Sequence, residues 1–352
     1  MNPTFFDLTR DARRILIIDP GVLGDVIHAL PGYWELRRNH PTAEIHAIAS
    51  PSGEQVLRLA RCVDRIWTLE QSGERRTLRA QLRVLSQLRR LRFDASINFS
   101  DNDRNVFHAV FIGGRHRLGL RGNRWHFWSP WLIPHWLSRD KRDLPVYQQR
   151  LRFLAQAGYS IDPTPRFGLE IPADAQAWAR LQSPGDSVHL SISASSPYKE
   201  WSIGQWAGLV RLLLAKDLPI VATSSDTPRE VQRLKELEQQ VTPDTVRFFP
   251  GGLDIPKLAA ILGQSRLHVG ADSGAIHLAM ALGIPTVGIY RDYSGRIEWT
   301  PSASPNRQIV RKCHCEGGLR TECQAAGLGL CLAAITPEEV MSQGVEPLLA
   351  AG

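Results

Sequence analysis

Residues 14–30 read RILIIDPGVLGDVIHAL, and the change of pattern within this stretch predicts the fold. The apolar run from Ile15 to Ile18 is typical of a strand buried on both faces of a parallel sheet. Gly21 and Gly24 permit a tight turn, and we expect a helix from about Asp25 onward. A strand that leads through a short turn into a helix is the usual start of a doubly wound α/β domain.

The same alternation continues along the chain and then starts again. Further strands are expected in AEIHAIAS, VDRIWTLE and FDASINFS of the first half, and in SVHLSISAS, LPIVATSS, RLHVGAD and PTVGIY of the second. The fold class is therefore α/β, with two Rossmann-like, doubly wound parallel-sheet domains and a cleft at the carboxyl edges of their strands. We expect domains at 1–170 and 171–335, and a C-terminal helix within 336–352. The Arg-, Trp- and Pro-rich residues 113–143 are expected to be irregular.

Charge and hydropathy narrow the range of partners. The net charge is +7, and residues 1–170 hold 26 Lys and Arg against 17 Asp and Glu, so the first half favours an anionic partner. No helix-turn-helix, zinc-finger or aromatic-platform pattern supports nucleic acid. Apolar runs are too short to span a bilayer, and the N-terminus lacks a signal-peptide pattern, so a cytoplasmic protein is expected.

Three segments carry polar residues just after expected strands. In residues 17–31, Asp25 is either the N-terminal cap of a helix or a general base at the carboxyl edge of a sheet. In residues 193–209, Lys199 follows small hydroxyl residues and either binds a diphosphate or points into solvent.

The third segment, residues 270–290, is GADSGAIHLAMALGIPTVGIY. Asp272, Ser273 and Gly274 end a strand, and the start of the following helix would stabilise a phosphate. In the alternative interpretation Ser273 is only a cap, and His277, one turn into the helix, is a buried packing residue.

Taken in this order, the three segments resemble the ADP-heptose:lipopolysaccharide heptosyltransferases, the inverting glycosyltransferases of family nine. The resemblance rests on ILIIDPGVLGDVIHALPGYWELRRNHPTAEI, SASSPYKEWSIGQWAGLV, ADSGAIHLAMALGIPTVGIY and the tail WTPSASPNRQIV with ITPEEV. It implies the GT-B fold, with the acceptor bound by the first domain and the nucleotide-sugar donor, an ADP-sugar, by the second.

By position, the resemblance makes Asp25 the catalytic base and implies that catalysis needs no metal cofactor. The donor-binding residues that it implies are Lys199, Asp226, Asp272, Ser273, Gly274 and His277, with Glu230 as an alternative to Asp226. One departure is Asp19, which stands where the family commonly has lysine and puts a second carboxylate near Asp25.

The basic residues around the irregular segment form a candidate acceptor site. Arginines bind phosphate bidentately, and tryptophans stack on sugars or lie at membrane interfaces. We therefore expect an anionic glycan or lipid-linked acceptor, or contact with the inner membrane leaflet, although a solvated arginine face is the simpler alternative. The residues are Arg104, Arg115, Arg117, Arg121 and Arg124, interleaved with Trp125, Phe127, Trp128, Trp131 and Trp136.

Four of the five cysteines cluster near the C-terminus as C-x-C-x7-C-x7-C. In a reducing cytosol this favours a structural metal, Fe or Zn, over disulfides, although the spacing matches no standard zinc finger. Some family members that modify autotransporter proteins hold a cysteine-bound iron, with different spacing. The candidate ligands are Cys313, Cys315, Cys323 and Cys331.

The leading function is transfer of heptose, or a related sugar, from an ADP-sugar to a lipopolysaccharide-core or other glycan. One alternative is a glycosyltransferase that modifies a protein acceptor. The other is a non-catalytic nucleotide- or glycan-binding protein of the same fold, which would not depend on Asp25.

Overall fold

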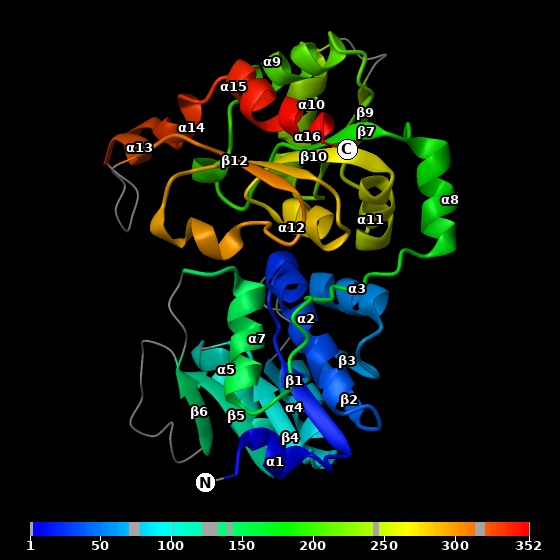
Figure 1. Ribbon diagram of the computed structural model, residues 1–352, viewed down its shortest axis with the longest axis vertical. Helices are drawn as coiled ribbons and strands as arrows, with labels where there is room; N and C mark the ends of the chain where they lie inside the picture. The colour runs from blue at the N-terminus through cyan, green and yellow to red at the C-terminus, as the bar shows by residue number, and fades with distance from the viewer. Residues whose placement is uncertain are drawn as a thin grey trace. The chain divides into compact units, whose positions relative to one another are not determined.

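The computed structural model describes residues 3–69, 78–100, 102–121, 133–138, 143–241, 246–313 and 321–351. The chain divides into two compact units, Met1–Glu170 and Ile171–Gly352, and each is built on its own parallel sheet (Figure 1). Helices cover both faces of each sheet. The expected class, α/β with two doubly wound parallel sheets, is confirmed.

The first sheet has the strand order β3-β2-β1-β4-β5-β6, and all of its pairs are parallel. The central strand β1 lies between β2 and β4, so the direction of the connections reverses there, at the topological switch point where open α/β sheets bind ligands. The strands are β1 (Arg14–Ile18), β2 (Glu44–Ala49), β3 (Arg65–Thr68), β4 (Ala95–Asn98), β5 (His116–Arg121) and β6 (His135–Ser138).

The helices of the first unit form two layers. Leu16 and Ile18 of β1 pack in one cluster with side chains of α4 and α5, whereas α2, which contacts α3 and α7, covers the opposite face. The helices are α1 (Phe5–Thr9), α2 (Leu23–Asn39), α3 (Pro51–Ala60), α4 (Leu78–Arg90), α5 (Asp103–Ile112) and α7 (Val146–Gln156).

The second sheet repeats this arrangement, with the order β12-β11-β10-β7-β8-β9 and parallel pairing throughout. Its switch point lies between β7 and β10. The strands are β7 (Ser187–Ser191), β8 (Ile220–Ser224), β9 (Val246–Pro250), β10 (Ser265–Ala271), β11 (Thr286–Tyr290) and β12 (Asn306–Val310).

In the second unit, α9, α10 and the C-terminal helices share the core of one face, while α8, α11 and α12 lie on the other (Figure 1). The α-helices are α8 (Ala173–Gln182), α9 (Ile203–Leu214), α10 (Pro228–Gln240), α11 (Ile255–Gly263), α12 (Gly274–Ala281), α13 (Thr321–Ala326), α14 (Leu330–Ala333), α15 (Pro337–Val340) and α16 (Glu346–Leu349). Short 3-10 turns span Pro197–Lys199 and Ser294–Trp299, and a π-turn spans Met341–Val345. Within the described ranges no helix is long and apolar enough to cross a bilayer.

One expectation about the fold was wrong. Residues 113–143 were expected to be irregular, yet their described parts contain β6, at the edge of the first sheet, and the partly buried β5 beside it. In the second sheet, the edge strands β9 and β12 were also missed. Edge strands contact a neighbour on one side only, so their sequences carry more polar residues than a buried run.

Two histidines face each other at the centre of the second sheet. His189 of β7 pairs in register with His268 of β10, and their Nδ1 atoms lie 2.8 Å apart, so one ring donates and the other accepts. Both side chains are fully buried. Burial lowers the pKa of His189 to about 3 and that of His268 well below its ordinary value. The folded protein therefore keeps both rings neutral.

This pair should make the second unit sensitive to acid. Below pH 6.5 the unfolded chain binds protons that the folded chain does not, so the unfolding free energy should fall as the pH drops from 7 to 5. The slope approaches about 1.4 kcal/mol per pH unit for each histidine. Denaturant unfolding at several pH values measures it. The double variant His189→Gln/His268→Gln should show a shallower slope, and an unchanged slope would assign the sensitivity to other groups.

Candidate active site

Asp25 lies at the switch point of the first sheet, beyond the carboxyl end of β1. It is the third residue of α2, and its Oδ2 accepts the backbone N–H of Val22 at 3.0 Å. A Cβ on Gly21 would come within 2.3 Å of the Asp25 Cβ, so only glycine lets the aspartate fold back over the turn. The capping bond is therefore present, and it holds the half-buried carboxylate in one orientation at the sheet edge.

A buried ion pair accompanies Asp25. The side chain of Asp19 follows β1 directly and accepts a hydrogen bond from Nη1 of Arg150, which comes from α7. The guanidinium carbon of Arg150 lies 5.4 Å from the centre of the Phe99 ring. Burial raises the pKa of the Asp19 carboxyl, and the charge of Arg150 opposes that shift. The acidic departure at position 19 thus comes with a cation from another helix, a residue that the sequence analysis missed.

The switch point of the second sheet brings together hydroxyl groups from two strands. Ser191 ends β7, and its Oγ lies 3.3 Å from Oγ of Ser273, which precedes α12. Because Ser273 makes no side-chain cap, the first N–H groups of α12 are not satisfied by it. The hydroxyl of Ser193 is buried and makes no hydrogen bond to a described residue. Such an arrangement suits an oxygen-rich anionic ligand.

Lys199 joins this edge through a salt bridge. Its Nζ lies 2.7 Å from Oδ2 of Asp272, and the hydroxyl of Tyr293 donates to the same oxygen at 3.1 Å. Burial raises the pKa of Tyr293, and the Asp272 charge acts in the same direction, so the tyrosine stays a donor. The structure thus brings Lys199, Asp272, Ser273 and Gly274 to one edge.

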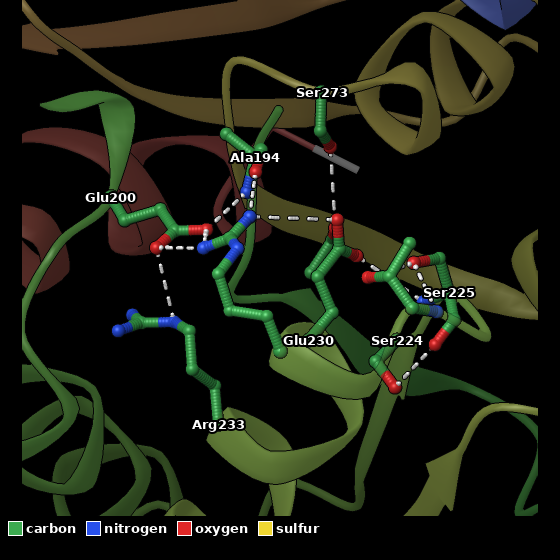
Figure 2. A network of polar contacts seen from close by, with 10 residues as sticks. Ala194, Glu200, Ser224, Ser225, Glu230, Arg233 and Ser273 are labelled. Atoms are coloured by element: carbon green, nitrogen blue, oxygen red, sulfur yellow. Dashed lines mark hydrogen bonds and ion pairs between the residues drawn. The ribbon is translucent and has the colours of Figure 1, made fainter. Parts of the chain in front are cut away.

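The other expected donor residues lie differently. His277 is buried in α12, with its ring 5.6 Å from that of Trp299. Asp226 accepts the N–H of Gly252, which follows β9, at 2.5 Å. Glu230, at the start of α10, accepts the N–H of Ser225 and lies within the polar network that also contains Ser273 (Figure 2).

Figure 2 also shows a charged cluster that no motif predicted. Glu200 follows Lys199, and its nearly buried carboxylate accepts the N–H of Ala194 at 2.9 Å. Two arginines of α10 bind that carboxylate: Arg229 at 2.6 Å and Arg233 at 3.2 Å. Arg229 also donates to the carbonyl of Ala194. The backbone N–H and carbonyl of Ala194 are therefore both hydrogen-bonded to the cluster, which fixes the loop from β7 to α9.

The described arginines of the candidate acceptor site do not form one cluster. Arg115 precedes β5 and Arg117 lies near its start, where it donates to the carbonyl of Gly114 at 2.8 Å. Arg121 ends the same strand, roughly 20 Å from Arg115. Arg104 lies in the first turn of α5, so Arg104 and Arg121 share the carboxyl edge with Asp25. Arg124 and the tryptophans at 125, 128 and 131 lie outside the described residues.

Three of the four clustered cysteines are described, and Cys323 and Cys331 carry free thiols. Cys313 follows β12, Cys323 is buried in α13, and Cys331 is buried in α14. No group of three or more His, Cys, Asp or Glu that could hold a metal occurs among the residues that the structure describes. Cys315 lies outside them.

Two Rossmann-like sheets, one with a carboxylate and the other with a lysine and a helix start at its switch point, are the arrangement of the GT-B fold class. The model of glycosyltransferase family 9 (heptosyltransferase) matches residues 81–327. The chain therefore belongs to glycosyltransferase family 9, and the expected resemblance is confirmed.

Curated and solved relatives agree with this assignment. The lipopolysaccharide core heptosyltransferase OpsX of Haemophilus influenzae is 23% identical over 286 residues, which cover 80% of each chain. The fold matches the Escherichia coli ADP-heptose lipopolysaccharide heptosyltransferase II with a TM-score of 0.75 and 21% identity, over 96% of this chain and 99% of that one. The E. coli heptosyltransferase WaaC, solved with ADP, gives a TM-score of 0.75 at 17% identity, over 95% and 99% of the two chains.

The cluster around Glu200 yields a stability prediction. Glu200→Gln keeps an acceptor for Ala194 but leaves Arg229 and Arg233 without their shared counter-ion, so the unfolding free energy should fall by about 3 kcal/mol. Denaturant unfolding measures the loss. Glu346→Gln, which breaks the exposed pair with Lys216, is the matched control and should cost less than about 1 kcal/mol. Equal effects of the two variants would contradict a buried, loop-fixing role.

Proposed function

We propose that this chain is an inverting glycosyltransferase that transfers heptose, or a related sugar, from an ADP-sugar to a lipopolysaccharide-core glycan. Family membership and the names of its relatives support the sugar and the acceptor. The observation that carries the donor half of the proposal is the assembly of Lys199, Asp272 and Ser273 at the start of α12. The donor unit is then 171–335 with the helix at 336–352, and the acceptor unit is 1–170.

In the proposed reaction each of the two units has one role. Asp25 takes the proton of an acceptor hydroxyl, whose oxygen attacks the anomeric carbon from the face opposite the diphosphate. The new glycosidic bond forms as the bond from carbon to phosphate oxygen breaks, and ADP leaves with the electron pair. Lys199 and the first N–H groups of α12 stabilise the charge that develops on the diphosphate, so no metal ion is required. Asp226 or Glu230 binds the donor ribose, and His277 supports α12 from within.

Replacing the base tests this assignment. Asp25→Asn retains an oxygen for the N–H of Val22 but cannot accept the proton, so kcat should fall 100-fold or more. Donor affinity, measured by titration calorimetry with the ADP-sugar, should not change. Asp7→Asn is the matched control, because Asp7 caps the start of α1 with the same geometry away from the sheet edge. Full turnover by the Asp25 variant would show that Asp25 only caps the helix and that another group is the base, whereas a wild-type protein without turnover would favour a binding protein.

An anionic acceptor is supported by Arg104 and Arg121 at the same edge as Asp25. Arg115, Arg117 and Arg124 are retained as weaker candidates for the same role. A structural iron or zinc bound by Cys313, Cys315, Cys323 and Cys331 also remains a proposal, which the clustering of the cysteines in the sequence supports.

The protein is further proposed to contact the cytoplasmic face of the inner membrane peripherally. The α4 sequence LRAQLRVLSQLRR has no acidic residue, and its arginines at 79, 83, 89 and 90 are exposed. On neighbouring α5, Phe107 is 51% exposed and stacks on Phe111, whose ring also lies 5.8 Å from the Arg89 guanidinium. Exposed arginines beside an exposed aromatic ring suit anionic lipid headgroups.

Charge reversal on α4 tests the membrane contact. Each arginine near an anionic surface contributes about 1 kcal/mol, so Arg83→Glu/Arg90→Glu should weaken co-sedimentation with phosphatidylglycerol vesicles at least tenfold. Arg180→Glu/Arg211→Glu in the second unit changes the net charge equally and should bind as the wild type does. If both pairs lose binding equally, net charge alone drives it. If the wild-type protein ignores the vesicles, the contact does not exist.

A further inference from the structure

The segment that follows β11 lies beside the donor edge. In the register of β10 and β11, Ala271 pairs with Ile289, so Asp272 and Tyr290 are the next residues along the two strands. Arg291 comes immediately after, beyond the carboxyl end of β11. Ligands of open α/β sheets bind beyond the carboxyl ends of the strands. Arg291 therefore occupies a position from which a residue can contact a ligand.

Tyr293 connects Arg291 to Lys199. Its hydroxyl donates to the Asp272 oxygen that also binds Lys199. Its ring centre lies 5.3 Å from the guanidinium carbon of Arg291 and 5.8 Å from Nζ of Lys199. Both cations therefore lie near the ring of Tyr293. The one carboxylate in this group, that of Asp272, forms a salt bridge with Lys199 and none with Arg291. The group carries an excess positive charge.

Hydrogen-bond donors in this segment lack acceptors. The Nε of Arg291, the hydroxyl of Tyr290 and the Nε of Arg296 are all buried and have no hydrogen-bond partner among the described residues. Arg296 binds Gln308 through Nη1, whereas Arg291 makes no ion pair within the described chain. A buried donor without an acceptor is destabilising, and more so if it is charged, so the unpaired Nε of Arg291 beyond the end of β11 indicates a group that receives acceptor oxygens from a ligand.

We propose that Arg291 is a second diphosphate-binding cation, which acts with Lys199 on the phosphate oxygens of the nucleotide-sugar donor. This inference rests on the proposed function, because it takes its ligand from that reaction. A guanidinium binds two phosphate oxygens at once, whereas an ammonium acts as a point charge. Arg291 therefore orients the diphosphate, and Lys199 with the α12 start neutralises it. As the bond to the anomeric carbon breaks, the added negative charge on the leaving group strengthens the contact.

The test compares ligands that differ only in phosphate. Arg291→Met removes the charge but keeps a long, apolar side chain against Tyr293, and the ligands are ADP, GDP, UDP and the corresponding nucleosides. For the diphosphate that the wild type binds, titration calorimetry should show the Kd rising tenfold or more in the variant. The Kd for the nucleoside should stay the same. Arg291→Lys should recover part of the affinity, since it restores charge without the bidentate geometry.

The controls separate this inference from the function on which it rests. Arg307→Met removes an exposed arginine of β12 in the same unit and should leave all affinities unchanged. Thermal unfolding of each variant checks that the fold is intact. If the wild type binds a diphosphate and Arg291→Met binds it equally well, Arg291 is not a ligand and the proposed function stands. If the wild-type protein binds no nucleoside diphosphate, both proposals are wrong. If Arg291→Met loses as much affinity for the nucleoside as for the diphosphate, only the assignment of Arg291 is wrong.

Discussion

In a parallel sheet every connection must return across a face of the sheet, and this constraint places both candidate sites. From β1 the chain passes to α2 on one face, whereas from β4 it passes to α5 on the other. The second unit repeats the arrangement, with α9 after β7 and α12 after β10. Because neighbouring connections diverge, the carboxyl ends of the two central strands stay uncovered. The loops with Asp25 in one unit, and with Lys199 and Ser273 in the other, lie at these ends.

Loops at such an edge are exposed to solvent and would be mobile without specific restraints. Here buried charges restrain them. Asp19 is bound by Arg150 of α7, and Glu200 is bound by two arginines of α10. A buried ion is tolerated only when it is paired, so each pair binds its loop to a neighbouring helix. Arg291 differs, since no described residue partners its charge. This contrast agrees with the proposal that Arg291 binds a ligand.

The inner strands could be predicted because their environment leaves a simple pattern. Ile15 to Ile18 and the strand around Val287 are buried on both faces and appear as apolar runs. The edge strands β6, β9 and β12 have a neighbour on one side only, and β5, the strand next to the edge, is only partly buried, so residues such as Arg121, Arg247 and Arg307 are tolerated there. A continuous apolar run is absent from these strands, and they resembled loops.

The candidate site likewise has a part that local sequence patterns predict and a part that depends on contacts between distant residues. By itself the sequence determined the two strand-turn-helix segments, because glycine, hydroxyl and acidic residues follow a strand within a few positions at such turns. The family resemblance then singled out Asp25, Lys199 and Asp272 within these segments. Tertiary structure alone decided which distant side chains complete these edges: Arg150 meets Asp19 across 131 residues, and Arg229 meets Glu200 across 29. It also decided that Arg104 and Arg121, rather than Arg115, lie at the edge with Asp25. Such contacts depend on the order of the strands and the packing of helices on them, and no local spacing encodes either.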